Sequence, residues 1–480
     1  MWTGHRGDGM VSRWTDEFAW AMDMQDTFDQ AVEENQTEFD MDVEEAVKSA
    51  VEEFQAQGVD LSNILCLAPS HRLGKKTWLT WKELKGTMMT QSEQEQEALA
   101  DSLQKLREQI QSSTSKDEDI LQLTLDNAMD VLLDYWKTHD LRPHLKVPFL
   151  DLVAVLLAHK VNKEKFYEAN GARSTLESLK QESNSPTEFA KGMLVASAAS
   201  SKHEKNKGLF MDGELTAMIV RGLQQHPCDD VVLQATCAAI KAITSADDEN
   251  AVTSESFKFA RDLANANVHV LLIECMRSMR GIDLKPRQME LLCHSLRQVC
   301  VNDEICKATV EEHGALAVVL PILQDDADKV DLVTACLKLL RQLAGSDQVK
   351  ARLVQDNILD LLKELVRIHA THPLVPEFAI GLLAVLCLRN PETASVATTE
   401  DMAGIIVETM ELHSENGRVQ RSCCMAVRNM VVRNEEYRAM WLEAGIEPML
   451  RQAKRKHGLL CEDVGSAALR DLGFDDYNST

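Results

Sequence analysis

The chain has 480 residues, of which 5% are aromatic and 26% charged, and its formal net charge at neutral pH is −25. A chain of this length is too long for one ordinary core, so it forms several domains or one elongated repeat array. The negative charge repels phosphate backbones and anionic lipids, which argues against nucleic acid and membrane surfaces as partners. Because no run of 18 apolar residues occurs, we expect no membrane-spanning segment.

The twelve cysteines are interpreted as reduced core side chains. Six of them lie in apolar helical runs, namely Cys237, Cys293, Cys300, Cys336, Cys387 and Cys423. No two cysteines form a CxxC pair, and Met1 to Trp20 lacks the features of a secretory signal. These features predict a cytoplasmic protein, and they leave entry into the nucleus open.

The first predicted element is an acidic N-terminal extension, residues 1–67. Twelve acidic residues and one lysine lie between Asp26 and Asp60. Asp42 and Glu45 form a capping-box pattern, and the apolar spacing that follows predicts an amphipathic helix over 42–57. We expect this helix to pack on the first repeat, or to act as an arm that docks on a partner or on the protein's own groove.

Residues 68–115 are interpreted as a connector that is partly disordered. The part from Ala68 to Thr90 is basic and contains Trp78 and Trp81, and a helix is predicted over Leu99 to Ile110. Basic residues between tryptophans can stack on single-stranded nucleic acid. Because the segment is short and the chain is acidic, we expect no nucleic-acid partner.

An internal repeat dominates residues 116–480. Four segments of the sequence align with one another: LRQVCVND, LRQLAGSD, LAVLCLRN and VRNMVVRN. Each begins in the last turns of an apolar helix and has Asp or Asn seven residues after its first residue. Asp and Asn suit a turn and a helix cap at that place. In three of the four, a turn-forming residue 17 or 18 positions after the first residue (Gly314, Asn357 or Gly445) is predicted to separate the next two helices.

The first residues of these segments serve as anchors, and the same frame extends along the chain. The anchors are Ala154, Ala196, Ile240, Leu296, Leu340, Leu383, Val427 and Leu469. Their spacing is 42 to 44 residues except for one interval of 56, which predicts an insertion near 247–267. A period in the low forties predicts an all-α, right-handed superhelical solenoid of the armadillo or HEAT type, preceded by the acidic helical extension.

The two ends of the chain resemble a known family. The string TFDQAVEENQTEFDMDVEEAVKSAVEEFQAQGVDLSNIL near the N-terminus and CEDVGSAALRDLG near the C-terminus are similar to the armadillo repeat-containing protein 6 family. The resemblance implies an intracellular armadillo solenoid with no assigned enzymatic activity. It does not supply a defined partner.

The resemblance to armadillo proteins invites comparison with those that bind extended peptides, which commonly carry Trp and Asn on the concave third helix. In the last four full repeats the Asn position, two residues after the anchor, holds Gln298, Gln342, Val385 and Asn429. No tryptophan occupies the Trp position four residues earlier, so this ladder is incomplete. Arginine precedes three of the polar residues, and the candidate concave row is Arg297, Gln298, Arg341, Gln342, Arg428 and Asn429. A row of guanidinium groups suits the carboxylates of an acidic partner segment.

No pattern for catalysis, a cofactor or a metal ion is found. The phosphate-binding, dinucleotide-binding, nucleophile-elbow and zinc-protease motifs do not occur, and His369 and His372 are interpreted as a surface turn. The sequence therefore predicts a monomeric, non-enzymatic adaptor that binds other proteins. The alternatives are an importin-like carrier of extended peptides and an enzyme with an unrecognised site.

Overall fold

The computed structural model describes residues 11–61, 64–73, 75–90, 95–139, 141–282 and 285–478. Residues 1–10, at the start of the predicted extension, lie outside these ranges. All regular structure in the described residues is helical, and none of these helices is long and apolar enough to cross a membrane. The chain divides into two compact units. Unit 1 is Met1–Leu215 with Ala246–Ser254, and unit 2 is Thr216–Ser245 with Glu255–Thr480.

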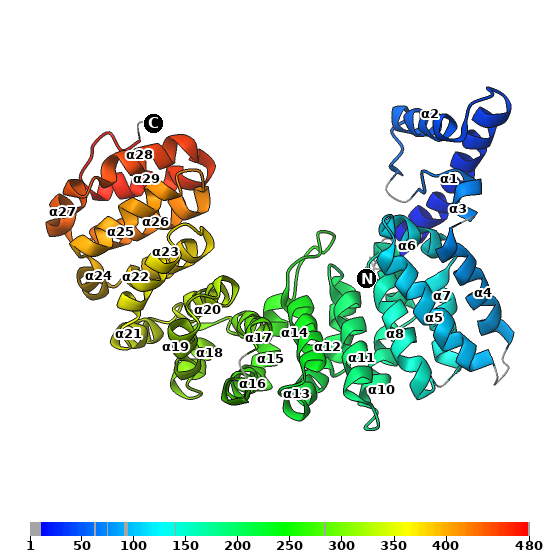
Figure 1. Cartoon of the computed structure of the whole chain (residues 1–480), viewed down its shortest axis with the longest axis horizontal. Coiled ribbons are helices and arrows are strands. Elements are labelled where there is room, and N and C mark those ends of the chain that lie inside the picture. The colour runs from blue at the N-terminus through cyan, green and yellow to red at the C-terminus, as the bar shows by residue number, and fades with distance from the viewer. Residues whose placement is uncertain are drawn as a thin grey trace, which may run out of the picture. The chain divides into compact units, whose positions relative to one another are not determined.

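The predicted anchors all lie in the third helices of successive three-helix repeats (Figure 1). These third helices are α8 (Pro143–Leu156), α11 (Pro186–Ser200), α14 (Asp230–Thr244), α17 (Pro286–Val299), α20 (Val330–Leu343), α23 (Leu374–Cys387), α26 (Gly417–Val431) and α29 (Gly458–Asp471). The repeat read from the sequence is therefore confirmed, and three helices per period of about 44 residues are typical of armadillo repeats.

Two further helices precede each third helix. The first helices are α6 (Lys116–Leu125), α9 (Lys160–Glu168), α12 (Glu204–Asp212), α15 (Ser256–Asn265), α18 (Asp303–Glu311), α21 (Asp347–Gln355), α24 (Pro391–Ala397) and α27 (Arg438–Glu443), the last preceded by the 3₁₀ turn η2 (Glu435–Tyr437). The second helices are α7 (Ala128–Thr138), α10 (Gly171–Lys180), α13 (Leu215–Gln225), α16 (Val268–Ile282), α19 (Leu316–Asp325), α22 (Ile358–Ile368), α25 (Glu400–Leu412) and α28 (Ile446–Lys456).

A residue with left-handed backbone separates the first helix from the second in most repeats. Gly314, Asn357 and Gly445, which the sequence predicted as breakpoints, have φ angles of 63°, 59° and 84°. Asn127 and Asn170 take the same conformation in two earlier repeats. Glycine and asparagine adopt this backbone more readily than other residues do, so they stop one helix and direct the next.

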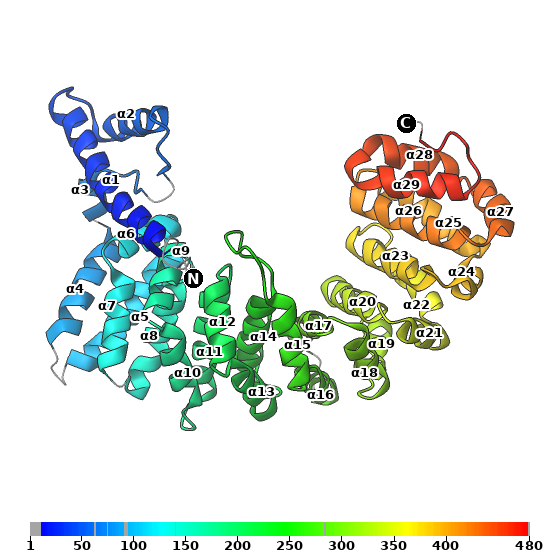
Figure 2. The same ribbon diagram turned by 180° about the vertical axis from the view of Figure 1, so that it is seen from behind.

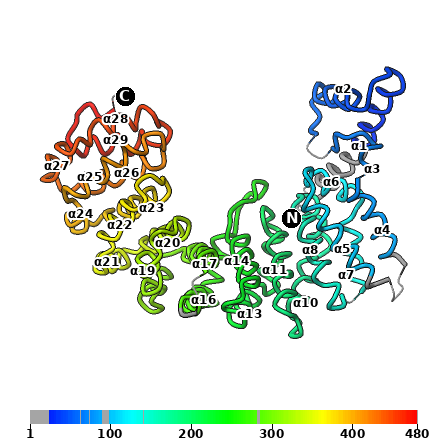
Figure 3. The backbone as a smooth tube through the Cα atoms, in the orientation of Figure 1, coloured from blue at the N-terminus to red at the C-terminus, as the bar shows by residue number. Residues whose placement is uncertain are grey.

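The third helices form a continuous row along one side of unit 2. Helices α17, α20, α23, α26 and α29 pack on one another in this order, whereas α18, α21, α24 and α27 lie on the other side (Figures 1, 2 and 3). Helix α20 is buried around most of its circumference because it contacts both α17 and α23. A helix with such a wide apolar surface can be stable only between neighbours.

Three histidines connect consecutive repeats of unit 2. His369, His413 and His457 follow α22, α25 and α28 and are spaced 44 residues apart. Each Nε2 donates a hydrogen bond to a backbone carbonyl of the preceding repeat; the acceptors are Ala327, Ala370 and Ser414, at 2.6, 2.7 and 2.8 Å. His369 is 8% exposed, so its interpretation as part of a surface turn was wrong. We call these three residues the histidine series.

The acidic extension in unit 1 forms a helical hairpin. Helices α1 (Val11–Thr37) and α2 (Val43–Ala56) share an apolar cluster, in which the rings of Phe28 and Phe54 meet edge to face with centroids 5.4 Å apart. The Asp42 side chain accepts a hydrogen bond from the Glu45 amide and so begins α2 as the capping pattern indicates. The hairpin buries its apolar seam internally, and its carboxylates lie mainly outside.

Residues 68–115 are not a loose connector, which corrects the sequence interpretation. They contain α3 (Pro69–Leu73), α4 (Lys76–Thr90) and α5 (Glu95–Ser112), and α5 packs on α8 as the third helices pack on one another. Trp81 is fully buried and donates from Nε1 to Asp126 at 2.6 Å. Two basic residues of this segment pair with acidic residues of the next repeat, which the local sequence does not reveal: Lys75 with Asp119 and Lys85 with Asp126.

The extra residues of the long interval lie between α14 and α15, before the first helix of a repeat. Residues 256–265 of the predicted insertion form the ordinary helix α15. The preceding segment, Ala246–Ser254, belongs to unit 1 and caps α12 there. Its Asp248 carboxylate accepts from the Glu204 amide at 2.8 Å, and Asp247 pairs with Lys207 at 2.7 Å.

Candidate functional site

The six residues of the candidate row lie on three third helices of unit 2. Arg297 and Gln298 lie on α17, Arg341 and Gln342 on α20, and Arg428 and Asn429 on α26. The equivalent position on α23, between α20 and α26, holds Ala384, so the arginine row is interrupted there. All three arginines are half-buried.

The polar partners in this row bond mainly to the protein itself. Gln342 Nε2 donates to the Cys300 carbonyl at 2.8 Å, and Asn429 Nδ2 donates to the Ala384 carbonyl at 2.7 Å. Each of these bonds joins a third helix to the end or the backbone of the preceding one. The Gln298 Oε1 atom, by contrast, is buried without a hydrogen-bond partner in the described structure.

The arginines have fewer polar contacts than the amides. Arg341 lies over the backbone of Gly381 on α23, where an added Cβ would come within 3.3 Å of its guanidinium. The Nε atom of Arg297 is buried and has no hydrogen-bond partner in the described residues. Arg428 approaches the Asp471 carboxylate at 3.9 Å, which is too long for a hydrogen bond.

Further basic side chains lie near the first half of the row. Burial, together with the charges of Lys338, Arg297 and Lys241, lowers the pKa of His294 from its ordinary value of 6.5. Burial and Arg297 likewise lower the pKa of Lys338, while Glu377 and Asp331 act in the opposite direction. We call Lys241, His294, Arg297, Lys338 and Arg341 the basic strip; it runs over α14, α17 and α20.

Sequence reasoning missed part of this strip. Lys241 occupies the position directly after its anchor, as Arg297 and Arg341 do, so the repeat frame could have identified it. Lys338 lies three residues before Arg341, on the preceding turn of α20. Its proximity to Arg297 depends on how α17 and α20 pack, and the sequence of one helix does not reveal that.

A second feature of unit 2 is a cavity of about 270 Å³ beside the end of the row. It lies where α23 and α26 end, and its basic lining consists of Arg389, Arg428 and Arg433. The apolar side chains of Leu388 and Val432 also line it, and each remains more than 40% exposed. No carboxylate is among the residues that line this cavity.

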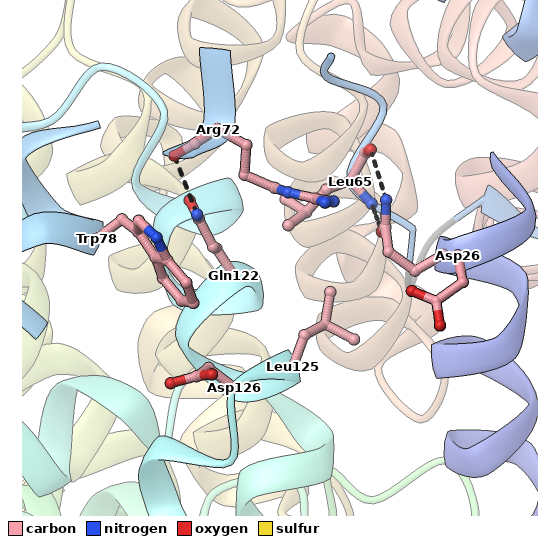
Figure 4. A pocket seen from close by; sticks show the side chains of 8 residues that line it. Asp26, Leu65, Arg72, Trp78, Gln122, Leu125 and Asp126 are labelled. Atoms are coloured by element: carbon pink, nitrogen blue, oxygen red, sulfur yellow. Dashed lines mark hydrogen bonds between the residues drawn. The ribbon is translucent and has the colours of Figure 1, made fainter. Parts of the chain in front are cut away.

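A smaller cavity of about 180 Å³ lies in unit 1, between the extension and the first helices (Figure 4). Gln25 forms two hydrogen bonds with the Leu65 backbone, at 2.7 and 3.2 Å, and Gln122 Nε2 donates to the Arg72 carbonyl at 3.1 Å. Arg72 itself pairs with Asp29. The Gln122 Oε1 atom is buried without a hydrogen-bond partner in the described structure. The bonds of Gln25 and Arg72 attach α1 to the rest of unit 1.

Within the described ranges, no cluster of three or more His, Cys, Asp and Glu residues is arranged to hold a metal ion. The adjacent thiols of Cys423 and Cys424 are both fully buried. Burial raises the pKa of Cys423, which keeps this thiol protonated at neutral pH.

The repeat architecture defines the chain as an armadillo repeat protein, and comparison with known proteins agrees. Residues 24–97 match the family model of the Armadillo repeat-containing protein 6 N-terminal domain. Armadillo repeat-containing protein 6 of Homo sapiens is 27% identical over 401 residues, which covers 78% of this chain and 75% of the human protein. The homolog of Drosophila melanogaster is 28% identical and covers 77% of each. The chain is thus similar to armadillo repeat-containing protein 6, as its two ends suggested.

Among solved structures, the crystal structure of an engineered protein superimposes with a TM-score of 0.62. It is 14% identical and covers 82% of this chain and 99% of its own. This likeness supports the fold alone.

Proposed function

We propose that this armadillo repeat protein is a non-enzymatic adaptor that binds acidic segments of other proteins along the third helices of unit 2. The basic strip is the observation that carries the proposal. Lys241, Arg297 and Lys338 lie close enough to His294 to add to the lowering of its pKa by burial, in a chain whose net charge is −25. A local positive potential on an acidic protein favours a negatively charged ligand.

The arginine side chains suit this role better than the amides of the row. A guanidinium group donates two parallel hydrogen bonds to a carboxylate, and Arg297 has a buried Nε atom without a partner in the described structure. Gln342 and Asn429 are already bonded to neighbouring helices. We therefore assign binding of the partner's carboxylates to Arg297, Arg341 and Arg428. The side chains of Gln342 and Asn429 instead join neighbouring third helices.

Partner capture from cell lysate tests this proposal. The triple variant Arg297→Glu, Arg341→Glu and Arg428→Glu is compared with the parent chain, and helical content by circular dichroism checks its folding. The matched control reverses three exposed arginines on first and second helices, Arg261→Glu, Arg352→Glu and Arg455→Glu. Both variants change the net charge equally.

We expect the row variant to lose specific partners and the control variant to retain them. We also expect the partners to dissociate as the salt concentration rises, because screening weakens exposed ionic contacts. A folded row variant with an unchanged partner list would show that the row serves the structure alone.

A further inference from the structure

Two consecutive repeats contribute the same types of residue to the cavity at the ends of α23 and α26. Leu388, Arg389 and Asn390 end one repeat, and Val432, Arg433 and Asn434 end the next, with a spacing of 44 residues. Each tripeptide provides an apolar residue, an arginine and an asparagine. Arg428 completes the basic lining from the last turn of α26.

The asparagines belong to the framework of this cavity. The Asn390 side chain accepts from the Thr393 amide at 3.0 Å and caps α24. Asn434 Nδ2 donates to the Met430 carbonyl at 3.1 Å, and it thereby fixes the chain that leaves α26. These bonds hold the backbone that carries the two exposed arginines.

Two of the three guanidinium groups are not engaged, whereas that of Arg428 forms an ion pair with Asp471 at 3.9 Å. Arg389 and Arg433 are exposed, and within the described residues neither has a hydrogen bond or an ion pair. Asp347 is close enough for Arg389 to contribute to the lowered pKa of its carboxyl, but that pKa is set mainly by a hydrogen bond with Lys350. Three cations around a cavity without a lining carboxylate form a site for an anionic group.

Arg389 also has an unusual backbone for its residue type. Its φ angle is 59°, in the left-handed region that glycine adopts without steric cost. Glycine would adopt this backbone more readily than arginine does, so the conformation at Arg389 carries a local steric cost. Such outliers concentrate at binding sites.

We propose that this cavity binds an acidic side chain of a partner peptide, with a neighbouring apolar residue of the peptide resting on Leu388 and Val432. The inference rests on the proposed function and specifies an anchoring point for it. The carboxylate bonds to the guanidinium groups of Arg389, Arg428 and Arg433. Leu388 and Val432, 43% and 45% exposed, offer the adjacent apolar surface. The ligand is therefore a short motif with Asp or Glu beside an aliphatic residue.

Selection from a displayed library of random twelve-residue peptides on the intact chain tests the inference. The selected peptides are synthesised with a fluorescent label, and their binding is measured by anisotropy. The cavity variant is Arg389→Gly with Arg433→Gln. Because glycine suits the backbone at position 389 and position 433 is exposed, this variant should fold as the parent does. The comparison variant, Arg297→Glu with Arg341→Glu, leaves the cavity intact.

We expect the selected peptides to be acidic with an adjacent aliphatic residue, and to bind the cavity variant about tenfold more weakly for each arginine removed. Acidic peptides that bind the cavity variant normally but lose affinity for the comparison variant would overturn this inference and leave the proposed function intact. Peptides without acidic residues, or no selected peptide at all, would overturn both.

Discussion

The histidine series illustrates how single residues hold consecutive repeats together. His413 is 8% exposed, and its ring spans from the end of α25 to the Ala370 carbonyl of the preceding repeat. A carbonyl oxygen can only accept, so the proton must lie on Nε2. The ring thus donates the hydrogen bond that a loop carbonyl does not receive from a helix backbone.

Replacement of this ring should lower stability measurably. We expect His413→Ala to reduce the free energy of unfolding by about 1 to 2 kcal/mol, because it removes a hydrogen bond and leaves a small void. The midpoint of urea unfolding measures the effect. His372→Ala is the matched control, since His372 is exposed in the turn between α22 and α23 of the preceding repeat. Equal midpoints for the two variants would refute a linking role for His413.

At the scale of elements, charged contacts fix the first helix of one repeat against the next. In unit 1, Glu164 on α9 accepts from His203 Nε2 at 2.9 Å and from Lys205 at 2.6 Å, at the start of α12. The hydrogen bond from His203, aided by Lys205, lowers the pKa of Glu164 from 4.5 to about 2, although burial acts in the opposite direction. The folded state therefore favours the ionised carboxylate.

This lowered pKa gives the contact a definite pH dependence. Because the folded pKa lies below the unfolded one, the carboxylate stabilises the fold above pH 4.5, and this contribution is lost as the pH falls toward 2. We expect Glu164→Gln to be less stable than the parent at pH 7, and the difference to shrink between pH 4.5 and 2. Urea unfolding at several pH values measures it, with the exposed Glu177→Gln as control. A difference independent of pH would contradict the assignment.

At the scale of the whole molecule, the stability of each repeat depends on the repeats next to it, because the third helices pack in a row. In unit 2 each third helix packs mainly on the one before and the one after it, as α26 does on α23 and α29. A repeat array of this kind is stabilised by the sum of such interfaces rather than by one central core. Loss of one interface should therefore weaken nearby repeats first.

Hydrogen exchange on a core variant tests this expectation. Val427 is fully buried on α26, and Val427→Ala should cost about 2 kcal/mol through lost apolar burial and the remaining cavity. We expect faster amide exchange in α23, α26 and α29, and unchanged exchange in α8 and α11 of unit 1. Uniformly faster exchange along the chain would instead indicate a single cooperative core.

The sequence by itself determined the repeat, its period and the breakpoints within it. These features are local, because each repeat must contain its own apolar helices, its left-handed Gly or Asn, and its polar cap. The frame also located the arginines and amides on the third helices. Whether those arginines bind a partner stays a prediction.

Only the tertiary structure decided what each repeat contributes to its neighbours. Trp81 and Lys85 of α4 looked like parts of a connector because their common partner, Asp126, lies 45 and 41 residues later in the chain. The linking role of His369 was likewise invisible, since the carbonyl it bonds lies 42 residues earlier. Burial and charge pairing depend on residues brought together by packing, and a local pattern contains no information about those distances.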